Sequence, residues 1–308
     1  MSLPLTIKET QDGLREKRFK ASEIVSQYFE RIKKYDIYDY DKGINSFLTL
    51  TEETAFEKAS MADETIESES EAAFKRYPLL GVTVAFKDLF STKGVRTTAG
   101  SKVLESYVPT FSATVVEKLE KAGAILIGKT NCDAWAHGAS GENSDFGPTK
   151  NPWNKEFVPG GSSSGSAAAI AANFSLISTG TDTGGSIRQP ANFCGVVGLK
   201  PTYGAVSRYG IIAMASSLDS VGHFSRTVED SEAIFNVTRG EDGKDGTVKD
   251  ATFLTPKTKI KLGVPKEYFI EGLDKEVEKA VLEASEVFKN EGVEIVDISL
   301  PHTKYANS

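Results

Sequence analysis

The sequence predicts an α/β fold: a layered α/β/α sandwich around a twisted, mixed and largely parallel sheet. Two observations predict this class. Short apolar segments with strand periodicity alternate along the chain with longer segments of helical periodicity. The chain also has 308 residues, of which 39% are hydrophobic. A chain of this size can bury a large core without disulfide or metal support. We therefore expect one domain over residues 1–308.

The N-terminal part, about residues 6–75, is expected to be helical. A helix begins at Ala21, with Ser22 as a cap of its first turn. Residues 51–75 are rich in Glu and Ala and predict a second helix, whose acidic run at 67–71 faces solvent. The apolar positions of the first helix fall on one face: Ile24, Val25, Tyr28, Phe29 and Ile32.

The remainder, about residues 78–308, alternates between strands and helices and is expected to be the catalytic core. Residues 82–86 alternate like a strand, and the helix before Gly123 ends at a favourable C-cap. Strands are expected at 82–86, 124–127, 176–179, 260–264 and 293–298. Helices are expected at 113–122, at 167–172, after Thr227, and at 275–289 with Asp274 as cap.

Charge and cysteine content exclude several classes of protein. The net charge is −7 and the isoelectric point is about 5.3, which opposes direct binding to nucleic acid. Only two cysteines are present, Cys132 and Cys194, so we expect a reducing, cytoplasmic location. Residues 1–10 lack the pattern of a signal peptide. No apolar stretch approaches the roughly 18 residues of a membrane span.

Residues 123–130 (Gly-Ala-Ile-Leu-Ile-Gly-Lys-Thr) match the phosphate-binding P-loop pattern. A P-loop needs a flexible turn between its two glycines, so that backbone N–H groups face the phosphate. Here the four intervening residues are apolar and predict a buried strand, and the helix precedes the motif. We therefore do not expect nucleotide binding.

Residues 161–165 (Gly-Ser-Ser-Ser-Gly) match the nucleophile elbow of α/β-hydrolases. That elbow must follow a strand directly, whereas residues 151–159 indicate a loop. Asp219 and His223 follow in the chain order that such a triad requires, so this alternative stays open.

The histidines, His137, His223 and His302, are too widely spaced to indicate a metal site, and we expect no cofactor.

Three other features predict chemistry when they are taken together. Lys87 ends an apolar strand, where burial would lower its pKa and make it a base. Residues 159–166 are rich in Gly and Ser, and residues 180–190 can point several N–H groups at one spot, as an oxyanion hole requires. Each has a simpler explanation: a lysine that reaches solvent, a helix cap with a flexible lead-in, and a tight or anion-binding turn.

The long runs at 160–166 (Gly-Gly-Ser-Ser-Ser-Gly-Ser) and 180–190 (Gly-Thr-Asp-Thr-Gly-Gly-Ser-Ile-Arg-Gln-Pro) resemble the amidase signature family. So does 193–202 (Phe-Cys-Gly-Val-Val-Gly-Leu-Lys-Pro-Thr). The resemblance extends from near the N-terminus to at least Asp230, and the spacings among Lys87, Ser162 and Ser186 agree with the family.

The resemblance implies an amide hydrolase that acts on linear C–N bonds through an acyl-enzyme. Ser186 would be the nucleophile, Ser162 (after a cis peptide bond) would relay its proton, and Lys87 would be the base. The resemblance also assigns an oxyanion hole and a set of supporting side chains. The oxyanion hole would be formed by the backbone N–H groups of Thr183, Gly184, Gly185 and Ser186. The supporting side chains would be Ser163, Asp182 and Arg188.

Within the family, residues 141–153, 203–210 and 215–219 are most similar to the A subunits of glutamyl-tRNA(Gln) amidotransferases. Those subunits release ammonia from glutamine and work with partner B and C subunits. The family's usual C-terminal part, which includes the groups that grip glutamine, has no counterpart in these 308 residues. We therefore expect a shortened, free-standing amidase for small or aromatic amides. The alternatives are a glutamine-hydrolysing A subunit of this kind and an inactive docking fragment of one.

Overall fold

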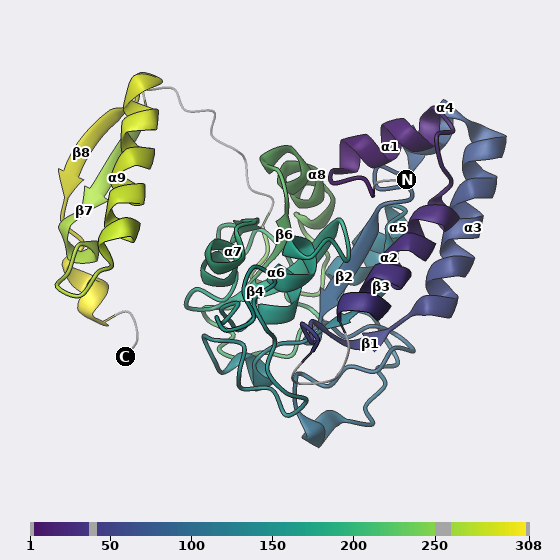
Figure 1. Cartoon of the computed structure of the whole chain (residues 1–308), viewed down its shortest axis with the longest axis horizontal. Coiled ribbons are helices and arrows are strands. Elements are labelled where there is room, and N and C mark those ends of the chain that lie inside the picture. The colour runs from purple at the N-terminus through teal and green to yellow at the C-terminus, as the bar shows by residue number, and fades with distance from the viewer. Residues whose placement is uncertain (1–2, 37–41, 250–259, 306–308) are drawn as a thin grey trace. The chain divides into compact units, whose positions relative to one another are not determined.

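The computed structural model describes residues 3–36, 42–249 and 260–305 (Figure 1). The chain divides into two compact units, residues 1–250 and 251–308. The expected organisation as a single domain over residues 1–308 remains a prediction.

The first unit is built on one mixed sheet, as the α/β prediction requires. Its described strands follow the order β1-β3-β2-β4-β6-β5. The central strands β3, β2 and β4 are parallel, whereas β1, β6 and β5 join antiparallel to their neighbours. Among the described strands of this sheet, two pairings are thus parallel and three are antiparallel, so the sheet is mixed as predicted but less parallel than expected, and its parallel part is the centre. The strands are β1 (Phe47–Leu50), β2 (Thr83–Lys87), β3 (Ile125–Thr130), β4 (Ile177–Asp182), β5 (Val197–Leu199) and β6 (Ser220–Ser225).

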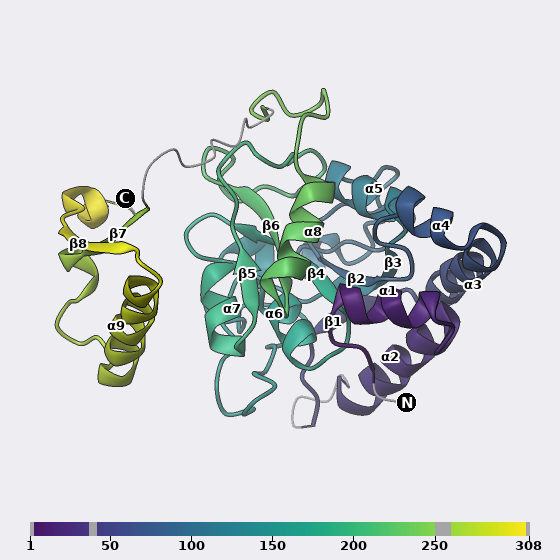
Figure 2. The same ribbon diagram turned by 90° about the horizontal axis from the view of Figure 1, so that it is seen from above.

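Helices surround this sheet, and those from the N-terminal part gather at one side in both views (Figures 1 and 2). The helix α6 packs against four strands of the sheet, and α2 packs on α3. The helices are α1 (Ile7–Arg15), α2 (Ala21–Tyr35), α3 (Glu52–Glu69), α4 (Glu71–Arg76), α5 (Thr114–Lys121), α6 (Ser164–Ala171), α7 (Arg188–Cys194) and α8 (Val228–Thr238). Short 3₁₀ turns occur at Lys102–Leu104 and Ala134–Ala136.

The N-terminal helices differ from the prediction in two details. The Ser22 hydroxyl does not cap α2: it donates to Asp63 of α3 at 2.6 Å, and Lys20 is the cap residue. The expected helix over 51–75 is two helices, broken at Ser70, which has a φ of +50°. Helical periodicity alone did not reveal this break, because serine carries no strong stop signal.

The strand β2 was predicted well because its residues are apolar and buried on both faces. Val84, Ala85 and Phe86 are fully buried between β3 and β4. The strands β1, β5 and β6 and the helix α7 were missed. The sequence of β6, Ser-Val-Gly-His-Phe-Ser, mixes polar and apolar residues, yet every residue is buried, so it lacks the pattern of a half-exposed strand.

The motif that resembles a P-loop lies in β3, as the apolar residues predict. All six residues of Ile125–Thr130 are buried, and Gly128 pairs with Leu50 of β1. A Cβ atom at Gly128 would lie 2.3 Å from the backbone oxygen of Thr49. The second glycine of the motif therefore allows β1 and β3 to lie close together. The lysine of the motif, Lys129, has a buried side chain within the sheet.

The second unit consists of a strand–helix–strand motif. The strands β7 (Lys261–Pro265) and β8 (Glu294–Ile298) are parallel, and α9 (Lys275–Asn290) connects them. The Asp274 side chain accepts from the N–H groups of Glu276 and Val277, which confirms the predicted cap. Two 3₁₀ turns complete the unit, Lys266–Tyr268 and Pro301–Tyr305.

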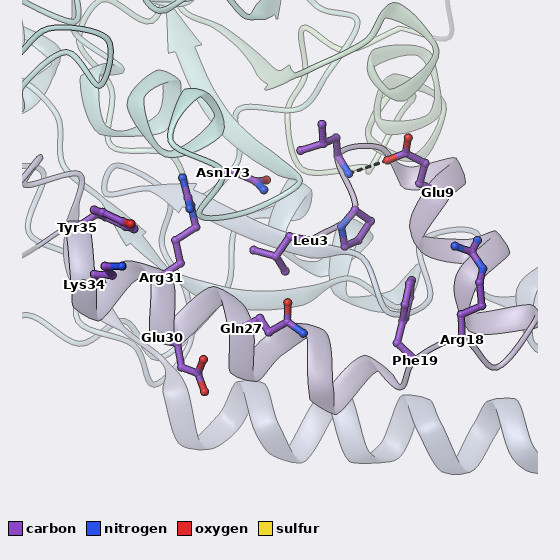
Figure 3. Close-up of a pocket in the computed structure, with 12 residues that line it drawn as sticks. Leu3, Glu9, Arg18, Phe19, Gln27, Glu30, Arg31, Lys34, Tyr35 and Asn173 are labelled. Carbon is purple, nitrogen blue, oxygen red and sulfur yellow. Dashed lines mark hydrogen bonds between the residues drawn. The ribbon is translucent and has the colours of Figure 1, made fainter. Parts of the chain in front are cut away.

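A surface pocket of about 840 Å³ lies beside α1 and α2 (Figure 3). Leu3, Phe19, Arg31 and Asn173 are among its lining residues, and none of the candidate catalytic residues lines it. Within the described residues, no helix combines the length and apolar character needed to cross a bilayer.

We predict that Gly128→Ala destabilises the protein, because the added methyl group would press on the backbone of β1. Crowding of this kind costs about 1–3 kcal/mol. The measurement is the free energy of unfolding from urea titration. Gly246→Ala is the matched control, since a Cβ atom there meets nothing within 4 Å. Equal stability of the two variants would contradict the proposed role of Gly128.

Candidate active site

Lys87 is the last residue of β2 and its side chain is fully buried. Its Nζ atom lies 2.8 Å from Ser162 Oγ, 3.0 Å from Ser163 Oγ and 2.8 Å from Thr181 Oγ1. A protonated lysine has three N–H donors, so three hydroxyl oxygens satisfy it completely. The alternative in which Lys87 reaches solvent is therefore wrong.

Burial changes the acidity of this amine. Loss of hydration lowers the pKa of Lys87 to about 8, although Cys132 and the carboxylates of Asp133 and Asp182 act in the opposite direction. Hydroxyl groups carry no charge and so do not hold the proton as a carboxylate would. Lys87 can therefore lose its proton near neutral pH and act as a base.

Ser162 and Ser163 lie in the segment that leads into α6, and both are buried. The peptide bond between Gly161 and Ser162 is cis, as the family resemblance implies. The backbone oxygen of Ser162 accepts from the Asp133 N–H at 3.2 Å. The Ser163 hydroxyl donates to the backbone oxygen of Thr181 at 3.2 Å, so its proton is directed away from Lys87.

Ser186 lies in the turn between β4 and α7 and is 8% exposed. Its backbone oxygen accepts from the Ser163 N–H at 3.3 Å, which brings the two serine segments together. Among the hydrogen bonds of the described residues, none involves the Ser186 hydroxyl. The structure thus joins Lys87 to Ser162 directly, and it joins Ser186 to Ser163 through a backbone hydrogen bond.

Asp182 organises the turn that contains Ser186. Its buried carboxylate accepts from the backbone N–H groups of Gly185 (2.8 Å) and Ile187 (3.0 Å). It also forms an ion pair with the Arg188 side chain, with an N–O distance of 2.9 Å. Burial alone would raise the pKa of Asp182, but the bonds from Arg188 and Ile187 outweigh it and hold the pKa below its ordinary value.

The oxyanion-hole prediction needs a correction at one position. The N–H of Gly185 is occupied by Asp182, so it does not face a substrate. The hydrogen bonds of the described residues leave the N–H groups of Thr183, Gly184 and Ser186 without a partner. A Cβ atom at Gly184 would meet nothing within 4 Å, so this side of the turn is open to a ligand.

Sequence analysis missed Thr181 as a partner of Lys87. Thr179 and Thr181 of β4 are two residues apart and project from the same face of the strand. The hydroxyl of Thr179 accepts from the Lys87 backbone N–H at 3.1 Å, and that of Thr181 accepts from Nζ. Strand periodicity would have placed Thr179 and Thr181 on one face, but it does not identify Lys87 as their partner, because the contacts join segments distant in the chain.

The nucleophile-elbow alternative is wrong in this structure. No strand among the described residues leads into Gly161. His223 lies in β6 and its Nε2 atom contacts Ser231 Oγ at 2.8 Å, while burial lowers its pKa to about 4. Asp219 accepts from the Thr183 hydroxyl at 2.6 Å. His223 and Asp219 therefore serve different contacts and do not form a triad.

Comparison with known proteins places this chain in a family. The Amidase family model matches residues 23–308. The chain belongs to the amidase signature family. Among the described residues of this amidase chain, no group of three or more His, Cys, Asp or Glu side chains could hold a metal ion.

Curated relatives with high identity share one name, the A subunit of glutamyl-tRNA(Gln) amidotransferase. The chain is 49% identical to the protein of this name from Carboxydothermus hydrogenoformans and 52% identical to that from Geobacter metallireducens. Each alignment covers 98% of this chain and 62% of the relative. The chain therefore spans about three fifths of the length of these relatives.

Solved structures of amidase family members have the same fold. The glutamyl-tRNA(Gln) amidotransferase A subunit from Thermotoga maritima superposes with a TM-score of 0.82 at 37% identity, over 98% of this chain and 62% of that one. The peptide amidase from Stenotrophomonas maltophilia gives a TM-score of 0.83 at 30% identity, over 97% and 63%. The predicted fold class and the family resemblance are thus confirmed.

Proposed function

We propose that the chain hydrolyses carboxylic amides to an acid and ammonia or an amine, through an acyl-enzyme on Ser186. The observation that supports this most is the contact between the buried amine of Lys87 and Ser162 Oγ at 2.8 Å. A serine hydroxyl is a weak nucleophile until a neighbouring base removes its proton. A desolvated lysine, relayed through a second hydroxyl, supplies such a base.

The proposed reaction has two halves. Ser186 Oγ attacks the amide carbon while its proton passes to Ser162, and the Ser162 proton passes to neutral Lys87. The N–H groups of Thr183, Gly184 and Ser186 stabilise the negative oxygen of the tetrahedral intermediate. The C–N bond then breaks, and the proton held by Lys87 returns through Ser162 to the leaving nitrogen. Water hydrolyses the ester on Ser186 by the same proton path.

Ser162 is a better relay than Ser163, although both contact Lys87. The Ser163 proton is directed to the backbone oxygen of Thr181, so this hydroxyl only accepts from Lys87. The Ser162 hydroxyl donates to no other group among the described residues, so its proton is available to the lysine. We assign Ser163 and Thr181 to holding the amine, and Asp182 and Arg188 to shaping the turn of Ser186.

A second candidate is glutamine hydrolysis, with the chain as the A subunit of a glutamyl-tRNA(Gln) amidotransferase. Its support is that curated relatives at 47–52% identity have this name. In this candidate the substrate is glutamine, and partner B and C subunits would use the ammonia. The first candidate is the hydrolysis of small or aromatic amides without partners, and its support is the triad alone. The same triad is the only support for either activity over an inactive docking fragment.

We predict that Ser186→Ala abolishes amide hydrolysis, with a loss on the order of 10⁴-fold or more, and that Lys87→Ala and Ser162→Ala have losses of similar order. Each removes a group in one proton path. The measurement is kcat/KM for a set of simple amides and for glutamine. Ser164→Ala is the matched control, because its hydroxyl bonds Thr149 and lies outside the relay. Full activity in Ser186→Ala would remove the nucleophile assignment.

We predict that kcat/KM rises with pH and levels off above about 8, the pKa of Lys87. Only the neutral amine accepts a proton, so protonation at lower pH removes the base, at a limiting tenfold per pH unit. The check is a pH profile from roughly pH 6 to 10. A profile that falls across neutral pH would be incompatible with a lysine base.

We predict that an assay with and without the partner proteins separates the two candidates. Turnover of simple amides by the chain alone supports the free-standing amidase. Glutamine turnover that appears only after the B and C subunits are added supports the amidotransferase candidate. Binding to these subunits without turnover of any amide would contradict both activities and support the docking fragment.

A further inference from the structure

The segment that contains Ser162 is tied to the segment that contains Ser186 on both sides of the relay serine. On one side, the Ser163 N–H donates to the backbone oxygen of Ser186 at 3.3 Å. On the other, the Gly161 N–H donates to Oε1 of Gln189 at 3.0 Å. Gln189 lies in the first turn of α7, the helix that directly follows Ser186. The residues before and after Ser162 are thus both bound to the nucleophile segment.

The close approach of α7 also explains why residue 160, at the start of this segment, is a glycine. A Cβ atom at Gly160 would lie 2.8 Å from the Pro190 Cα atom and 3.0 Å from Gln189 Oε1, and Gly160 has a φ of +81°. At Gly161, a Cβ atom would lie 2.0 Å from Asp133 Oδ2. A side chain at Gly160 would therefore meet α7, and one at Gly161 would meet the buried Asp133 carboxylate.

The Asp133 side is independently fixed. Its carboxylate accepts from the N–H groups of Gly141 (3.2 Å) and Asn143 (2.9 Å), and its own N–H donates to the Ser162 oxygen at 3.2 Å. Gln189 is the side chain that holds the backbone N–H of the residue before Ser162. The side-chain oxygen of Gln189 accepts from the N–H of Gly161, the residue before Ser162. The proton relay requires Ser162 to lie within hydrogen-bond reach of Ser186.

We propose that Gln189 is a positioning residue, which holds the relay serine Ser162 in register with the nucleophile Ser186 through its bond to the Gly161 N–H. This inference rests on the proposed function, because it concerns the same relay. Gln189 does not touch the amine of Lys87, whose partners are Ser162, Ser163 and Thr181. Loss of the bond should therefore slow proton transfer between the serines and leave the acidity of the lysine unchanged.

The test compares Gln189→Met, which keeps the length of the side chain and removes the acceptor, with Gln189→Glu, which keeps an oxygen acceptor. We expect Gln189→Met to lower kcat and the rate of Ser186 labelling by a fluorophosphonate about tenfold, with KM and the midpoint of the pH profile unchanged. Gln189→Glu should restore most of the labelling rate. Gln11→Met is the matched control. The Gln11 side chain donates to the backbone oxygen of Pro78, and neither Gln11 nor Pro78 belongs to the relay.

Amide hydrogen exchange of the same variants gives a second measurement that does not need catalysis. Exchange at Gly161 should become faster in Gln189→Met than in the wild-type protein and in Gln11→Met. Unchanged exchange would show that the bond is absent, and faster exchange with normal labelling would show that the bond does not position the relay. Either outcome overturns the inference while the proposed function stands. Absence of Ser186 labelling in the wild-type protein would instead overturn the proposed function, and the inference with it.

Discussion

The arrangement of the candidate site depends on one buried amine. Lys87 Nζ is surrounded by three hydroxyl oxygens from two different parts of the chain, the segment before α6 and the strand β4. A buried cation without such partners would cost several kcal/mol, whereas a neutral amine in the same place is tolerated. The sheet therefore holds this group where it is satisfied in both protonation states. One of these hydroxyl groups, that of Ser162, is also the group that we propose to pass the proton onward.

The rest of the site is arranged around this amine by the topology of the sheet. β2 lies between β3 and β4, so Lys87 and Asp182, the last residues of β2 and β4, belong to neighbouring parallel strands. The carboxyl ends of parallel strands lie at the same edge of a sheet, which is where α/β proteins place their ligands. The turn after β4 brings Ser186 to this edge, and Asp182 fixes the turn through its backbone bonds.

Much of this could be predicted from the sequence, for identifiable reasons. The burial of β2 follows from its apolar residues, and Asp274 is a recognisable helix cap. Ser162 and Ser186 lie in the long motifs that carry the family resemblance, whereas Lys87 was singled out as the end of an apolar strand. The structure adds the direct contact of Lys87 with Ser162. The N–H of Gly185 was assigned to the oxyanion hole by the family resemblance, and the sequence alone could not show that the Asp182 carboxylate accepts from it. Thr181 and Gln189 were not assigned, because their roles depend on contacts between segments distant in the chain.

The position of Lys87 in the middle of the sheet also limits how such a protein can change. A buried lysine on a strand with neighbours on both sides cannot be shifted without disturbing the core around it. The turn around Gly184, by contrast, borders open space. If the proposed function holds, new substrate preferences would thus have to arise in the surface segments that border Ser186, while the proposed relay that activates it stays the same.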